Sequence, residues 1–259
     1  MSAVPAATDA DLERRFGGLR RLYGEAGYAR LRAGRFAVVG LGGVGSWAAE
    51  ALARSGVAGL VLIDLDHIAE SNVNRQVHAL DTTIGQAKAQ ALRERIALIH
   101  PGCDVRAVEA FVDEGNWPGL LPGPVDALID ACDQVRAKAV LAAWALAQRV
   151  PLVTVGAAGG KRRAQHVEVA DLADVTHDPL LAALRQRLRQ QHGAARHGPI
   201  GVRCVFSREP VRRPPDEACE VEGNLNCHGY GSAVSVTASF GLVAAGEAIE
   251  PLLGADSPA

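Results

Sequence analysis

Residues 35–45 read RFAVVGLGGVG, and this stretch decides the fold. Its apolar run at 36–39 is typical of a buried parallel strand. The glycines that follow are Gly40, Gly42, Gly43 and Gly45. Without side chains, they permit a tight turn and let backbone N–H groups approach a phosphate. Residues 46–54 are predicted to form a helix whose N-terminus favours an anion, so the whole stretch predicts a nucleotide-binding loop.

A second apolar run, at 60–63, ends at Asp64, about 20 residues beyond the glycines. An acid at this position binds the ribose in such folds, so we predict that Asp64 is the ribose ligand. Asp66 either contacts the ligand as well or holds the following loop. That loop carries the candidate nucleotide-contacting residues Asn72, Asn74, Arg75 and Gln76. Glycine strings serve dinucleotides and mononucleotides alike, and the phosphate-directed arginine favours a mononucleotide.

Further strands and helices alternate along the chain. We expect a helix at 85–100, a strand at 104–110, a strand at 125–129, a helix at 135–149 and a strand at 152–155. This alternation predicts a doubly wound, Rossmann-like α/β fold with a mostly parallel sheet and a C-terminal extension. Ligands collect at the carboxyl ends of parallel strands, where the sequence has Asp130 and Asp133. Asp130 either belongs to the site or only orients Asp133.

Three regions are expected along the chain. They are a disordered lead-in at 1–13, a nucleotide-binding α/β domain at 14–160, and a substrate or dimer region at 161–254 that continues the same fold. The lead-in is small and polar and contains proline, whereas 14–31 is expected to be helical in pieces.

The third region is predicted to begin with a strand at 165–169. A helix starting at Asp178-Pro179, a strand at 202–206 and a small, apolar last element at 232–253 follow. For this last element we expect burial against the sheet or at a dimer interface. Membrane contact is the minor alternative, because a spanning helix needs about 20 predominantly apolar residues and Glu247 and Glu250 interrupt this one.

Composition sets limits on function. The chain has 259 residues, enough for a sizeable core, and its formal net charge of −2 at pH 7 gives no bulk attraction to nucleic acid. An RNA contact would need a local basic surface. The candidates for that surface are Lys161, Arg162, Arg163, Arg185, Arg187, Arg189, Arg196, Arg203, Arg208, Arg212 and Arg213.

The cysteines indicate a reducing compartment. Five in a chain of this length, with no start that resembles a signal peptide, predict free thiols and a cytoplasmic protein. They are Cys103, Cys132, Cys204, Cys219 and Cys227. None forms a Cys-x-x-Cys pair, so no zinc site is expected.

The order of these motifs resembles the E1-like, ThiF/MoeB-type adenylating family. Within that family, several passages resemble the tRNA threonylcarbamoyladenosine dehydratase branch. These passages are 15–18 with 22–24, 130–138, 201–207, and 229–232 with 236–241. Together these passages are spread over nearly the whole chain, so the resemblance is not limited to the nucleotide-binding half.

The resemblance implies a role for each site residue. The glycine loop would hold ATP, Asp64 the ribose, Asn74 and Arg75 the triphosphate, Lys88 a phosphate and Asp133 a magnesium ion. Catalysis would then rest on Arg75, Lys88 and Asp133, because cationic groups must stabilise charge on the phosphoryl oxygens. Each of these residues also has an alternative role when it is considered alone. Arg75 could pair with a neighbouring carboxylate, Lys88 could lie on a solvated helix face, and Asp133 could cap the helix that follows it.

For activity, the resemblance implies ATP-dependent dehydration of N6-threonylcarbamoyladenosine at position 37 of tRNA through an acyl-adenylate. The alternative is an adenylyltransferase that activates the C-terminus of a ubiquitin-like sulfur carrier. A nucleotide-binding partner without turnover is a third hypothesis, and an NAD-dependent oxidoreductase leaves the arginine loop unexplained.

The resemblance also implies partners. They are a tRNA that contains threonylcarbamoyladenosine, a second copy of the chain, and a cysteine desulfurase with its sulfur acceptor. In the homodimer, an N-terminal arginine would cross to the other subunit's ATP, with Arg15, Arg20 and Arg21 as candidates.

Overall fold

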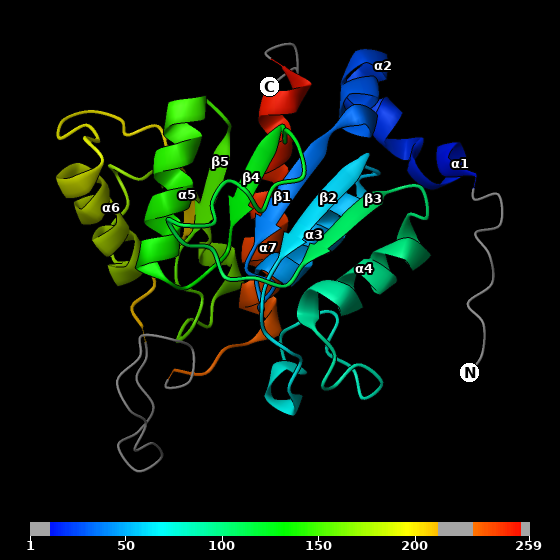
Figure 1. Cartoon of the computed structure of the whole chain (residues 1–259), viewed down its shortest axis with the longest axis horizontal. Coiled ribbons are helices and arrows are strands. Elements are labelled where there is room, and N and C mark those ends of the chain that lie inside the picture. Colours follow the sequence, from blue (N-terminus) through cyan, green and yellow to red (C-terminus); the bar gives the residue numbers. More distant parts are fainter. Residues whose placement is uncertain (1–10, 212–229, 255–259) are drawn as a thin grey trace.

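The computed structural model describes residues 11–211 and 230–254, and these form one mostly parallel α/β structure (Figure 1). Within them, the sheet has the strand order β3-β2-β1-β4-β5-β7-β6. The strands are β1 (Arg35–Val39), β2 (Gly59–Ile63), β3 (Asp104–Val108), β4 (Ala127–Asp130), β5 (Leu152–Val155), β6 (Glu168–Asp171) and β7 (Arg203–Phe206). Every neighbouring pair is parallel except β6–β7. The predicted fold class is therefore confirmed.

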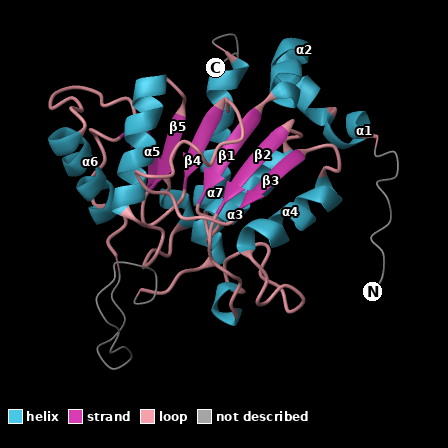
Figure 2. Ribbon diagram, viewed as in Figure 1, coloured by secondary structure: helices cyan, strands magenta, loops and turns pink. Residues whose placement is uncertain are grey.

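Helices cover both faces of the sheet (Figure 2). They are α1 (Leu12–Phe16), α2 (Gly18–Ala33), α3 (Gly45–Arg54), α4 (Lys88–Ile99), α5 (Val135–Gln148), α6 (Pro179–Gln191) and α7 (Val234–Leu253). Side chains alternate along β1: Phe36 and Val38 share a core with α2, α3, α4 and α7, whereas Ala37 and Val39 share a core with α5 and α6. Alternate burial on both faces explains why this strand is apolar throughout.

The N-terminal helical segment is divided, as the sequence predicts. The Asp11 side chain accepts the Arg14 N–H at 2.9 Å, so α1 begins at Leu12, two residues before the expected start of the folded region. Gly24, with φ +69°, then interrupts the regular backbone inside α2. The expected lead-in at residues 1–10 lies outside the described residues.

The strand expected at 165–169 begins three residues later than predicted. Residues Ala164–His166 form a 3₁₀ turn, η2, and β6 starts only at Glu168. The reason lies far away in sequence, since the Glu209 carboxylate accepts the backbone N–H groups of Arg162 and Arg163 and turns the chain just before η2.

The last helix is a core helix of this fold. By length and hydropathy, Val234–Leu253 could cross a membrane, yet half of that span is buried inside the protein. Its Val236, Phe240 and Ala244 belong to the same core as β1 and α3. At Gly241 the helix touches α3 so closely that a Cβ atom would overlap the Val44 carbonyl oxygen and lie 2.9 Å from the Trp47 Cβ.

We expect Gly241→Ala to lower the free energy of unfolding by about 1–3 kcal/mol, because α7 must move away from α3 to admit one methyl group. Gly246→Ala is the matched control, since a Cβ atom there meets no atom within 4 Å. Alanine is the better helix former, so the control should gain up to about 1 kcal/mol. Urea unfolding measures both, and equal stability of the two variants would contradict the close contact.

Candidate nucleotide site

The glycine loop lies at the carboxyl end of β1, and the space around the Cβ position differs from one glycine to the next. Gly40 has φ +83°, and a Cβ atom there would lie 2.8 Å from the backbone nitrogen of Cys132. At Gly45, a Cβ atom would overlap the Gly40 carbonyl oxygen. Gly42, in contrast, has no atom within 4 Å of its Cβ position. Gly40 and Gly45 are therefore needed to fold the loop, and Gly42 leaves space where a ligand can approach the backbone.

Asp64 ties the end of β2 to this loop. Its buried carboxylate accepts the Leu41 N–H at 2.6 Å and the Asp66 N–H at 2.8 Å. Burial raises the pKa of the Asp64 carboxyl above its ordinary value, against the lowering effect of the nearby Lys88 charge and these N–H groups. Asp64 therefore shapes the loop directly, and its contact with a ribose stays a prediction.

Arg75 lies beside the glycine loop. A Cβ atom at Gly43 would lie 3.1 Å from the Arg75 Cγ, and the Trp47 indole N–H donates to the Arg75 carbonyl oxygen at 2.9 Å. The guanidinium donates to the Ser71 carbonyl oxygen at 2.7 Å and to the Asn74 Oδ1 at 3.0 Å. Both acceptors are neutral, and no carboxylate among the described residues pairs with Arg75. Within the described residues, the positive charge of Arg75 is therefore not neutralised by a carboxylate.

The other residues of this loop differ in their contacts. Asn74 Nδ2 donates to the Ser232 carbonyl oxygen at 2.9 Å, which joins the loop to the start of α7. Asn72 is buried and its Oδ1 accepts the Ala69 N–H at 3.1 Å, so it holds the turn. Gln76 is also buried, and its Oε1 has no hydrogen-bond partner within the described residues.

Lys88 forms an ion pair with Asp66, and its Nζ lies 2.7 Å from the Asp66 Oδ2. The Lys88 side chain is 8% exposed and that of Asp66 is 55% exposed. The Lys88 side chain is therefore buried, and its alternative role on a solvated helix face is wrong. The Asp66 backbone carbonyl also accepts the Lys88 N–H at 3.0 Å, so Asp66 holds the start of α4 and faces Lys88.

Asp133 lies beyond the end of β4, the strand beside β1. Its side chain is exposed and makes no hydrogen bond or ion pair with any described residue. Helix α5 starts without a side-chain cap, so the alternative role of Asp133 as a cap is wrong. No group of three or more metal-ligating side chains occurs in the described part of the chain. A single carboxylate nevertheless fits Mg²⁺, which is commonly held by one or two carboxylates together with substrate phosphates and water.

Asp130 belongs to a buried network below the site. Its carboxylate accepts the Thr154 hydroxyl at 2.6 Å and lies 3.2 Å from the Lys138 Nζ. Lys138 also donates to the Val155 carbonyl oxygen at 2.8 Å, and the Cys132 N–H donates to Asp130 at 3.2 Å. Both charged side chains are completely buried. Asp130 thus fixes the turn that carries Asp133, as one of the two sequence interpretations predicts.

Sequence reasoning missed Lys138, Thr154 and Trp47. One signal for Lys138 was present, since it stands in an apolar, alanine-rich helix where a lysine side chain has to find a partner. Nothing in the sequence indicates that Thr154 faces Asp130 across neighbouring strands, or that Trp47 holds the arginine loop.

The predicted basic surface is divided by the fold. Lys161 is buried, and its Nζ donates to the Ser207 and Glu209 carbonyl oxygens at 2.7 and 3.2 Å. Other candidates bond to backbone or carboxylate oxygens. They are Arg185, Arg187, Arg189, Arg203 and Arg208. The side chains of Arg162, Arg163 and Arg196 are exposed and have no partner within the described residues, and Arg212 and Arg213 lie outside those residues.

The described thiols are poor nucleophiles. Burial, with the nearby Asp104 carboxylate, raises the pKa of Cys103 to about 12. Burial likewise raises the pKa of Cys132 and of Cys204 above the ordinary value. These three thiols stay protonated at neutral pH, while Cys219 and Cys227 lie outside the described residues.

Comparison with known proteins identifies the family of this chain. The ThiF family model matches residues 15–259. The chain belongs to the ThiF family. Among its ThiF-family relatives, the tRNA threonylcarbamoyladenosine dehydratase of Escherichia coli (strain K12) is 42% identical over 251 residues, which cover 93% of this chain and 94% of that enzyme. The dehydratase of Haemophilus influenzae (strain ATCC 51907 / DSM 11121 / KW20 / Rd) is 40% identical over 245 residues, with the same coverage.

Solved structures of ThiF-family proteins support the same relation. The crystal structure of the E. coli dehydratase in complex with ATP has a TM-score of 0.85 and 42% sequence identity, and the match covers 95% of this chain and 96% of that one. By contrast, the molybdopterin-synthase adenylyltransferase of E. coli (strain K12) is 36% identical over only 128 residues, 49% of this chain. The resemblance inferred from the sequence is therefore confirmed.

We expect Lys138→Met to lower the free energy of unfolding by about 3–5 kcal/mol, because it leaves the Asp130 carboxylate buried without its cation. The double variant Lys138→Met/Asp130→Asn removes both charges and should recover part of this loss. Urea unfolding of the wild type, both single variants and the double variant measures the coupling. A cost below about 1 kcal/mol for Lys138→Met would contradict a buried ion pair.

His78 predicts a pH effect on stability. It is almost completely buried, neither ring nitrogen has a partner in the described part of the chain, and burial, followed by the charges of Lys88 and Arg95, lowers its pKa to about 4. Between about pH 6.5 and pH 4 the unfolded chain binds a proton that the folded chain does not, so stability falls by about 2–3 kcal/mol as the pH drops.

Denaturation of His78→Gln at pH 7 and pH 4.5 separates this effect from that of the carboxylates, which both proteins share. The variant should lose less stability than the wild type over this interval. Equal losses would contradict the shifted pKa.

Proposed function

We propose that this chain is an ATP-dependent tRNA threonylcarbamoyladenosine dehydratase. One structural observation supports this proposal most directly. At the carboxyl ends of neighbouring strands, the open backbone at Gly42, the guanidinium of Arg75 and the free carboxylate of Asp133 border the same loop. Backbone amides, a guanidinium and a carboxylate that can hold Mg²⁺ suit a nucleoside triphosphate, and similarity to the E. coli and H. influenzae dehydratases covers 93% of the chain.

The reaction consists of two transfers. An oxygen of the substrate's threonyl carboxylate attacks the α-phosphorus of ATP, the bond to the β-phosphate breaks, and pyrophosphate leaves. An atom of the substrate's own carbamoyl group then attacks the activated carbonyl carbon and loses its proton. AMP departs with one oxygen of the former carboxylate, so the nucleoside has lost one water.

No enzyme nucleophile is needed for ring closure. The attacking atom and the acyl-adenylate belong to the same nucleoside, so holding the substrate in a bent conformation promotes the second step by proximity. The raised pKa values of Cys103, Cys132 and Cys204 agree with this, because none of these thiols is poised to form a thioester.

Each site residue receives a role in this proposal. The loop of Gly40, Gly42, Gly43 and Gly45, together with the N-terminus of α3, binds phosphates. The arginine loop adds Asn72, Asn74 and Gln76 to the nucleotide site, with Asn74 beside the triphosphate. Arg75 and Lys88 stabilise charge on the phosphoryl oxygens, and Asp64, with Asp66 beside it, faces the ribose. Asp133 would hold Mg²⁺, whose charge would neutralise the triphosphate.

We further propose a cytoplasmic homodimer without zinc. Of the N-terminal candidates, Arg15 donates to the Ile99 carbonyl oxygen and Arg20 pairs with Glu13, whereas Arg21 is exposed with no partner in the described residues. We therefore favour Arg21 as the residue that reaches the other subunit's ATP. A cysteine desulfurase with its sulfur acceptor is proposed from family resemblance alone.

The test is AMP release from ATP and Mg²⁺ with tRNA that carries threonylcarbamoyladenosine, while mass spectrometry follows the loss of one water from that nucleoside. We expect AMP only with the modified tRNA. Arg75→Ala should lower the turnover rate by about 100-fold or more. Arg75→Lys should lower it by less, because lysine keeps the positive charge but lacks the planar guanidinium that donates two parallel hydrogen bonds.

Arg196→Ala is the control, since the Arg196 side chain is exposed, has no partner within the described residues and precedes the amino end of β7. Pyrophosphate exchange with a sulfur-carrier protein, and none with modified tRNA, would move the assignment to the carrier-activating alternative. Absence of turnover with both would favour a non-catalytic nucleotide-binding partner.

A further inference from the structure

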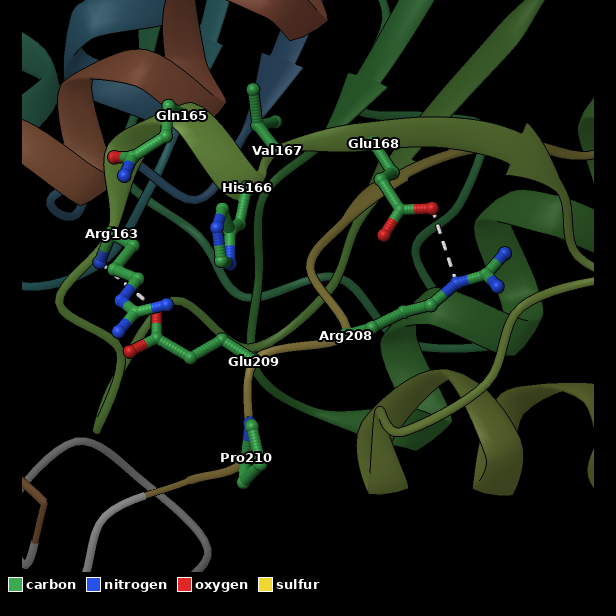
Figure 3. A pocket seen from close by; sticks show the side chains of 8 residues that line it. All are labelled: Arg163, Gln165, His166, Val167, Glu168, Arg208, Glu209 and Pro210. Atoms are coloured by element: carbon green, nitrogen blue, oxygen red, sulfur yellow. Dashed lines mark hydrogen bonds and ion pairs between the residues drawn. The ribbon is translucent and has the colours of Figure 1, made fainter.

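A cavity of about 720 Å³ lies at the β6 side of the sheet (Figure 3). Its lining residues are Arg163, Gln165, His166, Val167, Glu168, Arg208, Glu209 and Pro210. Glu168, the first residue of β6, pairs with Phe206, the last residue of β7. Because β7 is parallel to β5, β4 and β1, the cavity lies at the carboxyl edge of the sheet. The glycine loop and Asp133 occupy this same edge.

A continuous piece of structure connects the cavity with the nucleotide site. Between them runs the segment 156–163, which follows β5 and leads into η2. Gly160 N–H donates to the Gly231 carbonyl oxygen at 2.9 Å, just before α7. In the first turn of α7, the Thr237 Cγ2 would lie 3.2 Å from a Cβ atom at Gly43. A ligand that contacts both the cavity and the nucleotide site would therefore lie along the carboxyl edge of the sheet.

The cavity wall is held rigidly. Glu209 Oε2 accepts the backbone N–H groups of Arg162 and Arg163 at 3.1 and 2.9 Å, and the buried Lys161 Nζ donates to the Glu209 carbonyl oxygen. Opposite this wall, Arg208 Nε lies 3.1 Å from Glu168 Oε2. Figure 3 shows the His166 ring in the space between these two groups. The exposed side chains of Arg162 and Arg163 form no hydrogen bond or ion pair within the described residues.

The chemistry of the lining fits an unpaired nucleotide better than a bare anion. Inside, Arg208 is paired with Glu168, and the Glu209 carboxylate accepts two backbone N–H groups, so the interior carries no large excess of positive charge. Gln165 and His166 supply donors and acceptors for a base edge, and planar rings and guanidinium groups stack on bases. The lining residue Arg163 and its exposed neighbour in sequence, Arg162, suit the phosphate of the same nucleotide.

We propose that this cavity binds an unpaired nucleotide of the substrate tRNA close to the modified adenosine, with its base inside and its phosphate against Arg162 and Arg163. This inference rests on the proposed function and adds to it the place where the RNA is held. It also explains how a chain with net charge −2 can bind RNA: the contact is one base with one phosphate, rather than a broad basic surface.

The first experiment measures binding and turnover separately with Arg163→Ala. The KM for tRNA and the dissociation constant for an anticodon stem-loop should rise about tenfold, as for one charge-assisted phosphate contact. The turnover rate at saturating tRNA and the KM for ATP should stay as in the wild type. The salt dependence of binding should weaken by about 0.7 in log–log slope, the value for one phosphate of a single strand.

Arg196→Ala is again the matched control and should change none of these values, whereas Arg163→Lys should restore most of the affinity. A second readout is cross-linking of a stem-loop that carries 4-thiouridine beside the modified adenosine. We expect the cross-link in the peptide that contains Gln165 and His166, and its loss in Gln165→Ala/His166→Ala.

The outcomes separate this inference from the proposed function. RNA binding that depends on Arg163, without dehydration by the wild type, would support the cavity and overturn the dehydratase proposal. Dehydration by the wild type, with affinity, salt slope and cross-link unchanged in the variants, would overturn the cavity alone. A rise in the KM for ATP without a change in RNA affinity would also overturn it, because the cavity would then serve a free nucleotide.

Discussion

The close approach of the glycine loop to the turn after β4 is the constraint on which the site depends. Gly40 and Gly45 have no room for a Cβ atom, since the Gly40 position is crowded by Ala131 and Cys132 and the Gly45 position by the Gly40 carbonyl. Without this contact, the backbone amides after β1 and the carboxylate of Asp133 would stand apart. With it, the turn that carries Asp133 lies against the glycine loop. Arg75 lies beside Gly43 of the same loop, where the Trp47 indole holds its backbone carbonyl.

The part of the site formed by the glycine loop and Asp64 was predictable, because its residues lie close together in the sequence. A strand, a glycine loop, a helix and an acid after the next strand form one short unit, so residue order alone relates Gly42 to Asp64. Asp130 could be placed at the correct strand end, but its partners could not be found. Lys138 reaches it from a helix and Thr154 from the neighbouring strand, and such contacts depend on the three-dimensional packing.

Charge was the least predictable property. In sequence, Lys161 is the first of three consecutive basic residues and reads as surface. In the fold, its ammonium is enclosed by carbonyl oxygens that follow β7, whereas the neighbouring Arg162 and Arg163 are exposed. The strand expected at 165–169 failed for a related reason, because Glu209 bends the preceding backbone. Both differences arise from residues more than 40 positions away, as the intervals of 46 to 48 residues in these contacts show.

The two lysine–aspartate pairs of the site differ in a way that bears on their use. Lys138 and Asp130 are both completely buried, so neither can leave the other without losing several kcal/mol. Lys88 is buried, but its partner Asp66 is more than half exposed. If a phosphate took the place of Asp66 beside Lys88, the Asp66 carboxylate would move into water. Hydration of that carboxylate would offset the loss of its ion pair with Lys88. The first pair is suited to hold the turn in place, and the second is suited to exchange its anion when a nucleotide binds.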